Sequence, residues 1–193
     1  SAGLPTCGDV NTFLSAKRLW DLAHSPELPA TTHYYGMVDD GGGFMRGCAL
    51  DIPSFVASGP TGTNTLGWDT DGSYGDWYGG HELSHTWGRF HAEFCGAAAG
   101  LPYPYADGRI SPTLMGDDAL YGFDIVTRAI YGPNWHDVMT YCTYQWISDF
   151  TSHGLMDFFL GDAGAARGRL ASEQQTDRLL VAGYVFEREV AGN

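Results

Sequence analysis

The strongest constraint on this chain is an eleven-residue segment with three histidines at fixed spacing. Residues 81–91 are His-Glu-Leu-Ser-His-Thr-Trp-Gly-Arg-Phe-His. On a helix, His81 and His85 leave the same face, so both imidazoles can bind one ion. Gly88 permits the positive φ that ends a helix, and the chain can then turn back so that His91 becomes a third ligand. Three protein ligands leave a fourth position for water or substrate, as in catalytic zinc sites.

The acidic residue beside the first histidine suits such a catalytic site. Glu82 is rotated away from the ligand direction, so we expect it to act as general acid/base on water without binding the metal. The alternative is an amphipathic helix that carries three histidines by chance, but the added glycine and third histidine make coincidence improbable. A structural zinc domain would need a fourth protein ligand, and no Cys or His stands where one is expected.

The segment resembles the zinc signature of the metzincin metallopeptidases. That family also carries a Met-containing turn beneath the metal, and the sequence Asp-Val-Met-Thr-Tyr-Cys at 137–142 is similar to it. The resemblance implies that Met139 forms an apolar floor under the imidazoles; an ordinary core methionine is the alternative. Tyr141 matches a position where astacin-like and serralysin-like members carry a tyrosine that can ligate the resting metal and stabilise the oxyanion.

A wider resemblance connects the chain to secreted bacterial metzincin-type proteases, which often carry C-terminal modules. It covers Trp77–Cys95, 137–142 and 145–149. It implies an α+β fold over residues 1–165, with a twisted mixed sheet, an active-site helix, a mostly irregular lower subdomain and a C-terminal helix. Residues 166–193 would then be a linker followed by the first strand of a downstream domain, or by the last strand of this one.

The activity implied by this resemblance is zinc-dependent endopeptidase hydrolysis of proteins or peptides, with one catalytic zinc ion. A catalytically inactive metzincin-like module for binding or adhesion is the alternative.

Hydrophobic periodicity and turn residues predict the elements around the motif. We expect helices over Asp9–His24 (with Asp9 as N-cap), 76–90 (ending near Gly88) and Asp149–Leu160, and strands over His33–Val38, Phe44–Ile52, Phe55–Ser58 and Arg178–Glu189. The small residues of Gly161–Gly168 are typical of a linker.

Cysteine use and charge indicate a secreted protein. Four cysteines without a Cys-x-x-Cys pair favour two disulfides in an oxidising compartment. The net charge of −13 argues against nucleic acid and against an anionic membrane surface as partners. No apolar run has the length of a membrane span, and no signal-peptide pattern is present, so we expect any signal to have been removed. We also expect a monomer.

Four cysteines allow three pairings, and the zinc motif favours one of them. Cys95 lies four residues after His91, and Cys142 adjoins Tyr141. A bridge between Cys95 and Cys142 would hold the third-ligand loop against the Met-turn, and Cys7 would then pair with Cys48 to join the first helix to a strand.

Two further sites are weaker predictions. Asp69, Asp71 and Asp76 lie in a loop with alternating oxygen ligands that suits calcium, although a solvated loop is the alternative. A substrate cleft could use Gly43 and Phe44 at an open strand edge, and Tyr144 and Trp146 as the wall of the pocket beyond the scissile bond. The alternative is that both of these aromatic residues belong to the core.

Overall fold

The protein has an α+β architecture, as the sequence predicts. We describe it from a computed structural model, which covers residues 6–39, 46–62, 74–98, 100 and 102–170. The predicted strand at Arg178–Glu189 lies outside these residues, as do Gly43, Phe44, Asp69 and Asp71.

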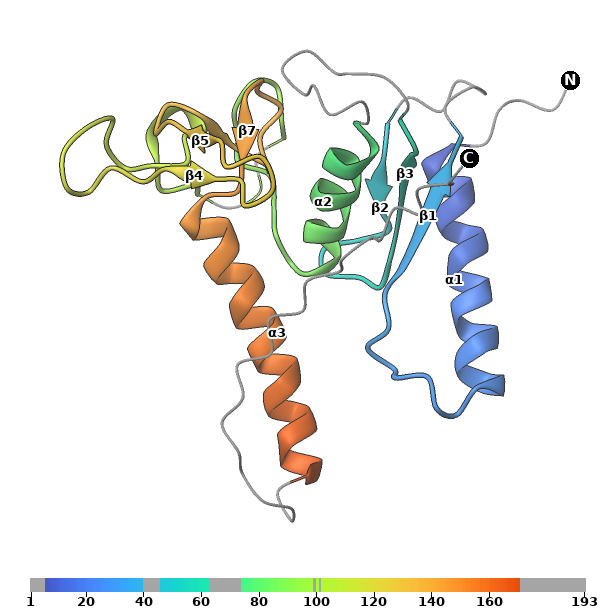
Figure 1. Cartoon of the computed structure of the whole chain (residues 1–193). Helices are drawn as coiled ribbons and strands as arrows, with labels where there is room; N and C mark the ends of the chain where they lie inside the picture. Colours follow the sequence, from blue (N-terminus) through green and yellow to red (C-terminus); the bar gives the residue numbers. More distant parts are fainter. Residues whose placement is uncertain (1–5, 40–45, 63–73, 99, 101, 171–193) are drawn as a thin grey trace, which may run out of the picture.

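One half of the molecule is a three-stranded sheet between two helices (Figure 1). Its elements are α1 (Cys7–His24), β1 (Tyr34–Val38), β2 (Cys48–Ala49), β3 (Val56–Pro60) and α2 (Gly75–Thr86). The central strand β3 pairs parallel with β1 and antiparallel with β2, and all five of its residues are buried. Helices α1 and α2 both pack on β3. The sheet therefore fixes the position and direction of α2, which carries His81 and His85.

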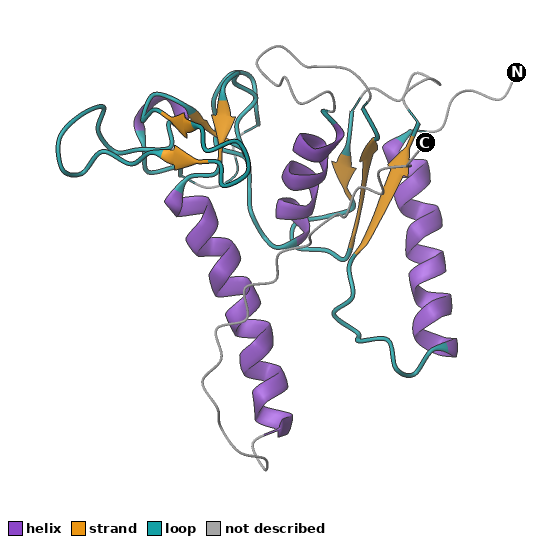
Figure 2. Ribbon diagram, in the orientation of Figure 1, coloured by secondary structure: helices purple, strands orange, loops and turns teal. Residues whose placement is uncertain are grey.

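The other half is mostly loop, with short strands above a long helix (Figure 2). It contains a 3-10 turn (Ala106–Gly108), β4 (Gly122–Phe123), β5 (Ile130–Tyr131), β6 (His136–Asp137), β7 (Gln145–Trp146) and α3 (Asp149–Leu170). Strands β4 and β5 pair antiparallel, and β6 pairs parallel with β7. The loops of this half lie on the side of α2 opposite the sheet, as expected for an irregular lower subdomain (Figure 1).

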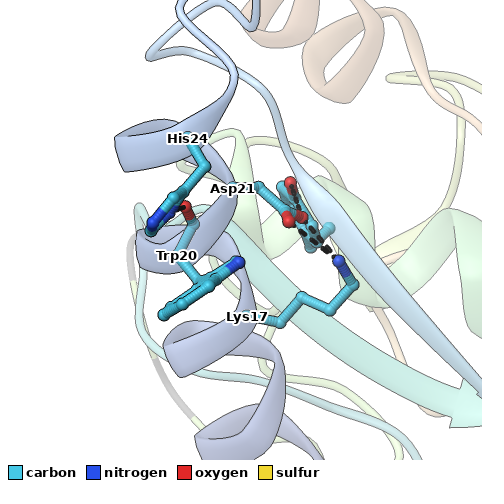
Figure 3. Close-up of polar contacts among 5 residues, drawn as sticks. Lys17, Trp20, Asp21 and His24 are labelled. Carbon is cyan, nitrogen blue, oxygen red and sulfur yellow. Dashed lines mark hydrogen bonds and ion pairs between the residues drawn. The ribbon is translucent and has the colours of Figure 1, made fainter.

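Helix α1 begins two residues earlier than predicted, and Asp9 is not its N-cap. Thr6 is the N-cap, because its hydroxyl accepts from the Asp9 amide while the Asp9 carboxylate accepts from the Thr6 amide. This reciprocal capping box requires Ser or Thr three residues before an acid. Further along α1, Lys17 forms an ion pair with Asp21 one turn later, on the part of the helix drawn in Figure 3.

Helix α3 extends well beyond the predicted end at Leu160. It begins after Ser148, whose hydroxyl accepts from the Thr151 amide, and it continues to Leu170. The expected linker at Gly161–Gly168 is therefore helical. Three of its eight residues are alanines, the best helix formers, and the helix continues in spite of three glycines.

The other predicted elements agree except in length, and α2 ends at Thr86 instead of near Gly88. The short strands β4–β7 were not predicted. Strands β1 and β3 match the expected ones closely, whereas β2 is confined to Cys48–Ala49 of the predicted Phe44–Ile52. Both predicted disulfides are confirmed, with Cα–Cα distances of 5.8 Å for Cys7–Cys48 and 5.1 Å for Cys95–Cys142. Among the described helices, none is long and apolar enough to cross a membrane.

Candidate metal centre

The three predicted ligands converge on one point. His81 and His85 project from the same face of α2, and the chain turns back at Gly88 (φ 82°) to bring His91 beside them. The Nε2 atom of His91 lies 3.1 Å from Nε2 of His81 and 3.0 Å from Nε2 of His85. Among the described residues, these three histidines are the group able to hold a metal ion.

The backbone fixes which ring nitrogen of two ligands faces this point. Nδ1 of His81 lies 2.7 Å from the carbonyl oxygen of Val138, and Nδ1 of His85 lies 2.7 Å from that of Arg89. A carbonyl oxygen can only accept, so both Nδ1 atoms carry the proton and donate. In the neutral rings the lone pair is therefore on Nε2, as metal-ligating histidines require.

Burial keeps these rings neutral. It lowers the pKa of His81 to about 3 and that of His85 to about 4, helped by repulsion from neighbouring imidazolium charge. Burial also lowers the pKa of His91. At neutral pH three nitrogen atoms thus meet with too few protons to bond one another, which is unfavourable unless a cation lies between them.

The spacing fits a tetrahedral ion. Zinc–nitrogen bonds of about 2.0–2.1 Å at tetrahedral angles place ligand nitrogens about 3.3–3.4 Å apart. The observed 3.0 and 3.1 Å are within a few tenths of an ångström of that value. Imidazole ligands suit zinc among the divalent metals, so the donor set fits the predicted cofactor.

The turn that contains Met139 is tied to both sides of this centre. The Val138 amide donates to the Trp146 carbonyl oxygen at 2.9 Å, which fixes the carbonyl that holds His81. The Met139 carbonyl accepts from the Ala92 amide at 3.0 Å, next to His91. Met139 itself is buried. The predicted turn therefore lies against the histidines.

A buried carboxylate that the sequence analysis did not single out organises this turn. Asp137 accepts from the Met139 amide (2.8 Å), the Ser148 amide (2.9 Å) and the Thr151 hydroxyl (3.0 Å). Burial raises its pKa, and these hydrogen bonds offset part of the rise. Asp137 thereby joins the turn to the first turn of α3. In the sequence, only its position two residues before Met139 indicates this role.

Glu82 lies on α2 beside the first histidine, and it is buried against the sheet. Its burial raises the pKa of the carboxyl group to about 7, although a hydrogen bond from the Ala49 backbone amide of β2 opposes the rise. Gly47 makes room for this side chain, because a Cβ atom there would lie 2.7 Å from Cγ of Glu82. The role of Gly47 was not visible in the sequence.

Tyr141 lies at the rim of the centre. Its ring centroid is 4.9 Å from that of His91 and 5.8 Å from that of His81, and the residue is 46% exposed. Burial and then the charge of Glu82 raise the pKa of its hydroxyl, while the positive charge of Arg46 lowers it. Arg46 influences Tyr78 in the same way, so it contributes positive charge that the sequence analysis did not assign to this site.

The two aromatic residues predicted for the cleft wall separate in the structure. Trp146 lines a large cavity beside α2, whereas Tyr144 is 55% exposed and is not among the residues lining that cavity. Asp76, the described member of the predicted calcium loop, is in the first turn of α2, where its carboxylate accepts from the Trp77 amide.

No protein-family model, curated protein or solved structure matches this chain.

Proposed function

We propose that this protein is a secreted zinc-dependent endopeptidase of the metzincin type. The observation that carries the proposal is the convergence of three Nε2 atoms, two of them with protonated Nδ1 atoms held by carbonyl oxygens, beside a buried glutamate. The similarity of the Met139 turn to that of metzincins supports the same assignment. The two disulfides are consistent with an oxidising compartment.

His81, His85 and His91 would hold the ion. When bound, zinc supplies Lewis acidity, which lowers the pKa of a coordinated water and polarises a carbonyl group. Glu82 accepts the proton of the attacking water and delivers it to the leaving amine. Burial raises the pKa of this carboxyl group, which favours the transfer of a proton to it from the attacking water. The Tyr141 hydroxyl donates to the oxygen that becomes negative in the transition state.

The proposal is tested by measuring zinc content and peptide hydrolysis together. We expect one zinc per chain, loss of casein or peptide cleavage on chelation, and recovery on adding zinc. Glu82→Ala should retain the zinc and lose activity by several orders of magnitude, because the water loses its base. Glu27→Ala, which removes an exposed carboxylate, is the control and should be fully active.

Two outcomes would contradict the proposal. A Glu82→Ala protein that retains a tenth of wild-type turnover would remove Glu82 from the chemistry. A zinc-loaded protein that cleaves no peptide would instead support the binding or adhesion module.

A further inference from the structure

A cavity of about 910 Å³ lies beside the metal centre, between α2, the loops of β4–β7 and the start of α3. In Figure 1, the β4–β7 loops and α3 lie on one side of α2, and the sheet lies on the other. One stripe of α2 lines it, at the helical spacing of Trp77, Gly80, Ser84 and Trp87. The histidines occupy the neighbouring stripe, and the ring centroid of Trp77 is 5.1 Å from that of His81. Val138, whose carbonyl oxygen lies 2.7 Å from Nδ1 of His81, also lines the cavity, so its wall adjoins the first histidine.

Aromatic rings form much of the cavity wall, and several are held in place. The rings are those of Trp77, Trp87, Tyr131, Trp135 and Trp146. The ring centroid of Tyr131 is 4.1 Å from that of Trp135 and 4.6 Å from that of Trp146. Gly122 packs against Trp146 so closely that a Cβ atom there would lie 2.5 Å from the indole. These rings are therefore held by packing against one another and against Gly122.

The charge of the wall is negative. Asp76 and Asp124 line the cavity, and among the described residues its lining contains no Lys, Arg or His. The Asp124 carboxylate accepts from the Val126 and Thr127 amides and is bonded to the Thr127 hydroxyl. These bonds, with that of the Thr127 hydroxyl foremost, lower its pKa. Asp124 therefore remains ionised at neutral pH.

Fixed aromatic faces together with carboxylates favour a planar cation. We propose that this cavity binds an arginine side chain of the polypeptide substrate, with the guanidinium stacked on the aromatic wall near Asp76 and Asp124. Arginine suits it better than lysine, because guanidinium stacks on rings and is more weakly hydrated. The volume is at the upper end of ligand sites, so neighbouring residues of the substrate enter with the arginine. This inference names the substrate class of the proposed peptidase and rests on that function.

The test measures binding separately from cleavage. Zinc-loaded Glu82→Gln protein is titrated with fluorescent peptides of one sequence that carry Arg, citrulline, Phe or Glu at a single position, and the position is scanned along the peptide. Citrulline keeps the shape of arginine and removes its charge. At one position we expect the Arg peptide to bind about tenfold more tightly than the citrulline peptide, as a cation–π contact combined with a carboxylate provides.

Substitutions in the cavity wall test whether this cavity causes the preference for arginine. Asp124→Asn keeps an oxygen for the Val126 and Thr127 amides, so the loop should survive while the Arg preference falls severalfold. Asp118→Asn, which changes an exposed acid outside the cavity lining, is the matched control and should leave the preference intact. Equal binding of Arg and citrulline at every position, tighter binding of Phe than of Arg, or an unchanged preference in Asp124→Asn would each overturn the inference.

The result is independent of catalysis. If wild-type protein cleaves no peptide but Glu82→Gln still prefers arginine, the peptidase proposal fails and the cavity assignment stands.

Discussion

At the residue scale, Glu82 shows how far its surroundings change a side chain. Its carboxyl has a pKa of about 7 in the folded protein against a reference value of 4.5. Between these pH values the folded state binds more protons than the unfolded state. The stability contributed by the protonated group is therefore complete below about pH 4.5 and is lost as the pH rises through about 7.

This linkage predicts that Glu82→Gln stabilises the zinc-free protein at high pH. The variant should be more stable than wild type by up to about 3 kcal/mol above pH 7, with a difference that disappears towards pH 4.5. Urea unfolding of chelated protein over pH 4.5–8 measures it, with Glu27→Gln as the exposed control. If the stability difference between Glu82→Gln and wild type is constant with pH, burial does not destabilise the ionised carboxylate.

Tyr141 makes a second prediction at this scale. If its hydroxyl stabilises the developing oxyanion, Tyr141→Phe should lower kcat by roughly 10²-fold and leave KM nearly unchanged. The ring volume is kept, so the fold and the zinc content should also be kept. Steady-state kinetics tests this, with Tyr121→Phe as a control that removes another exposed tyrosine hydroxyl. A kcat reduced less than about threefold would leave zinc as the main oxyanion stabiliser.

At the scale of elements, the centre depends on the junction of the Met139 turn with α3. Asp137→Ala would leave the amides of Met139 and Ser148 and the hydroxyl of Thr151 without their acceptor in a buried position. We expect a loss of about 3 kcal/mol or more in the free energy of unfolding, measured by urea denaturation. Asp118→Ala, at an exposed position, should change it by less than about 0.5 kcal/mol. A similar loss in both variants would refute the structural role of Asp137.

The helices differ in how well the sequence predicts them. The ligands on α2 follow from local geometry, because a spacing of four and a terminal glycine decide which side chains meet. The predicted end of α3 was wrong, because the glycines of 161–168 suggested a linker where the structure continues the helix. The predicted start of α1 was two residues too late, because the capping residue Thr6 lies before the hydrophobic pattern begins.

At the scale of the whole molecule, the predictions that succeeded were those confined to short segments or to few alternatives. The three histidines that converge lie within eleven residues, and four cysteines allow three pairings. The contacts that the sequence missed join distant segments. Gly47 packs against Glu82, Asp137 bonds to the start of α3, and aromatic residues from three regions line one cavity. Such contacts depend on how elements far apart in the sequence pack against one another, which a single sequence does not specify.

The partners of the first two histidines have an evolutionary consequence. His81 and His85 donate to main-chain oxygens of residues 138 and 89, not to side chains. Substitutions at those two positions can change every side-chain atom and still leave the acceptors in place, provided that the backbone follows the same path. The sequence around the three histidines can therefore change during evolution while the orientation of the His81 and His85 rings is kept. A distant descendant could keep the site with little beyond its histidines, its glutamate and its turn to mark the ancestry.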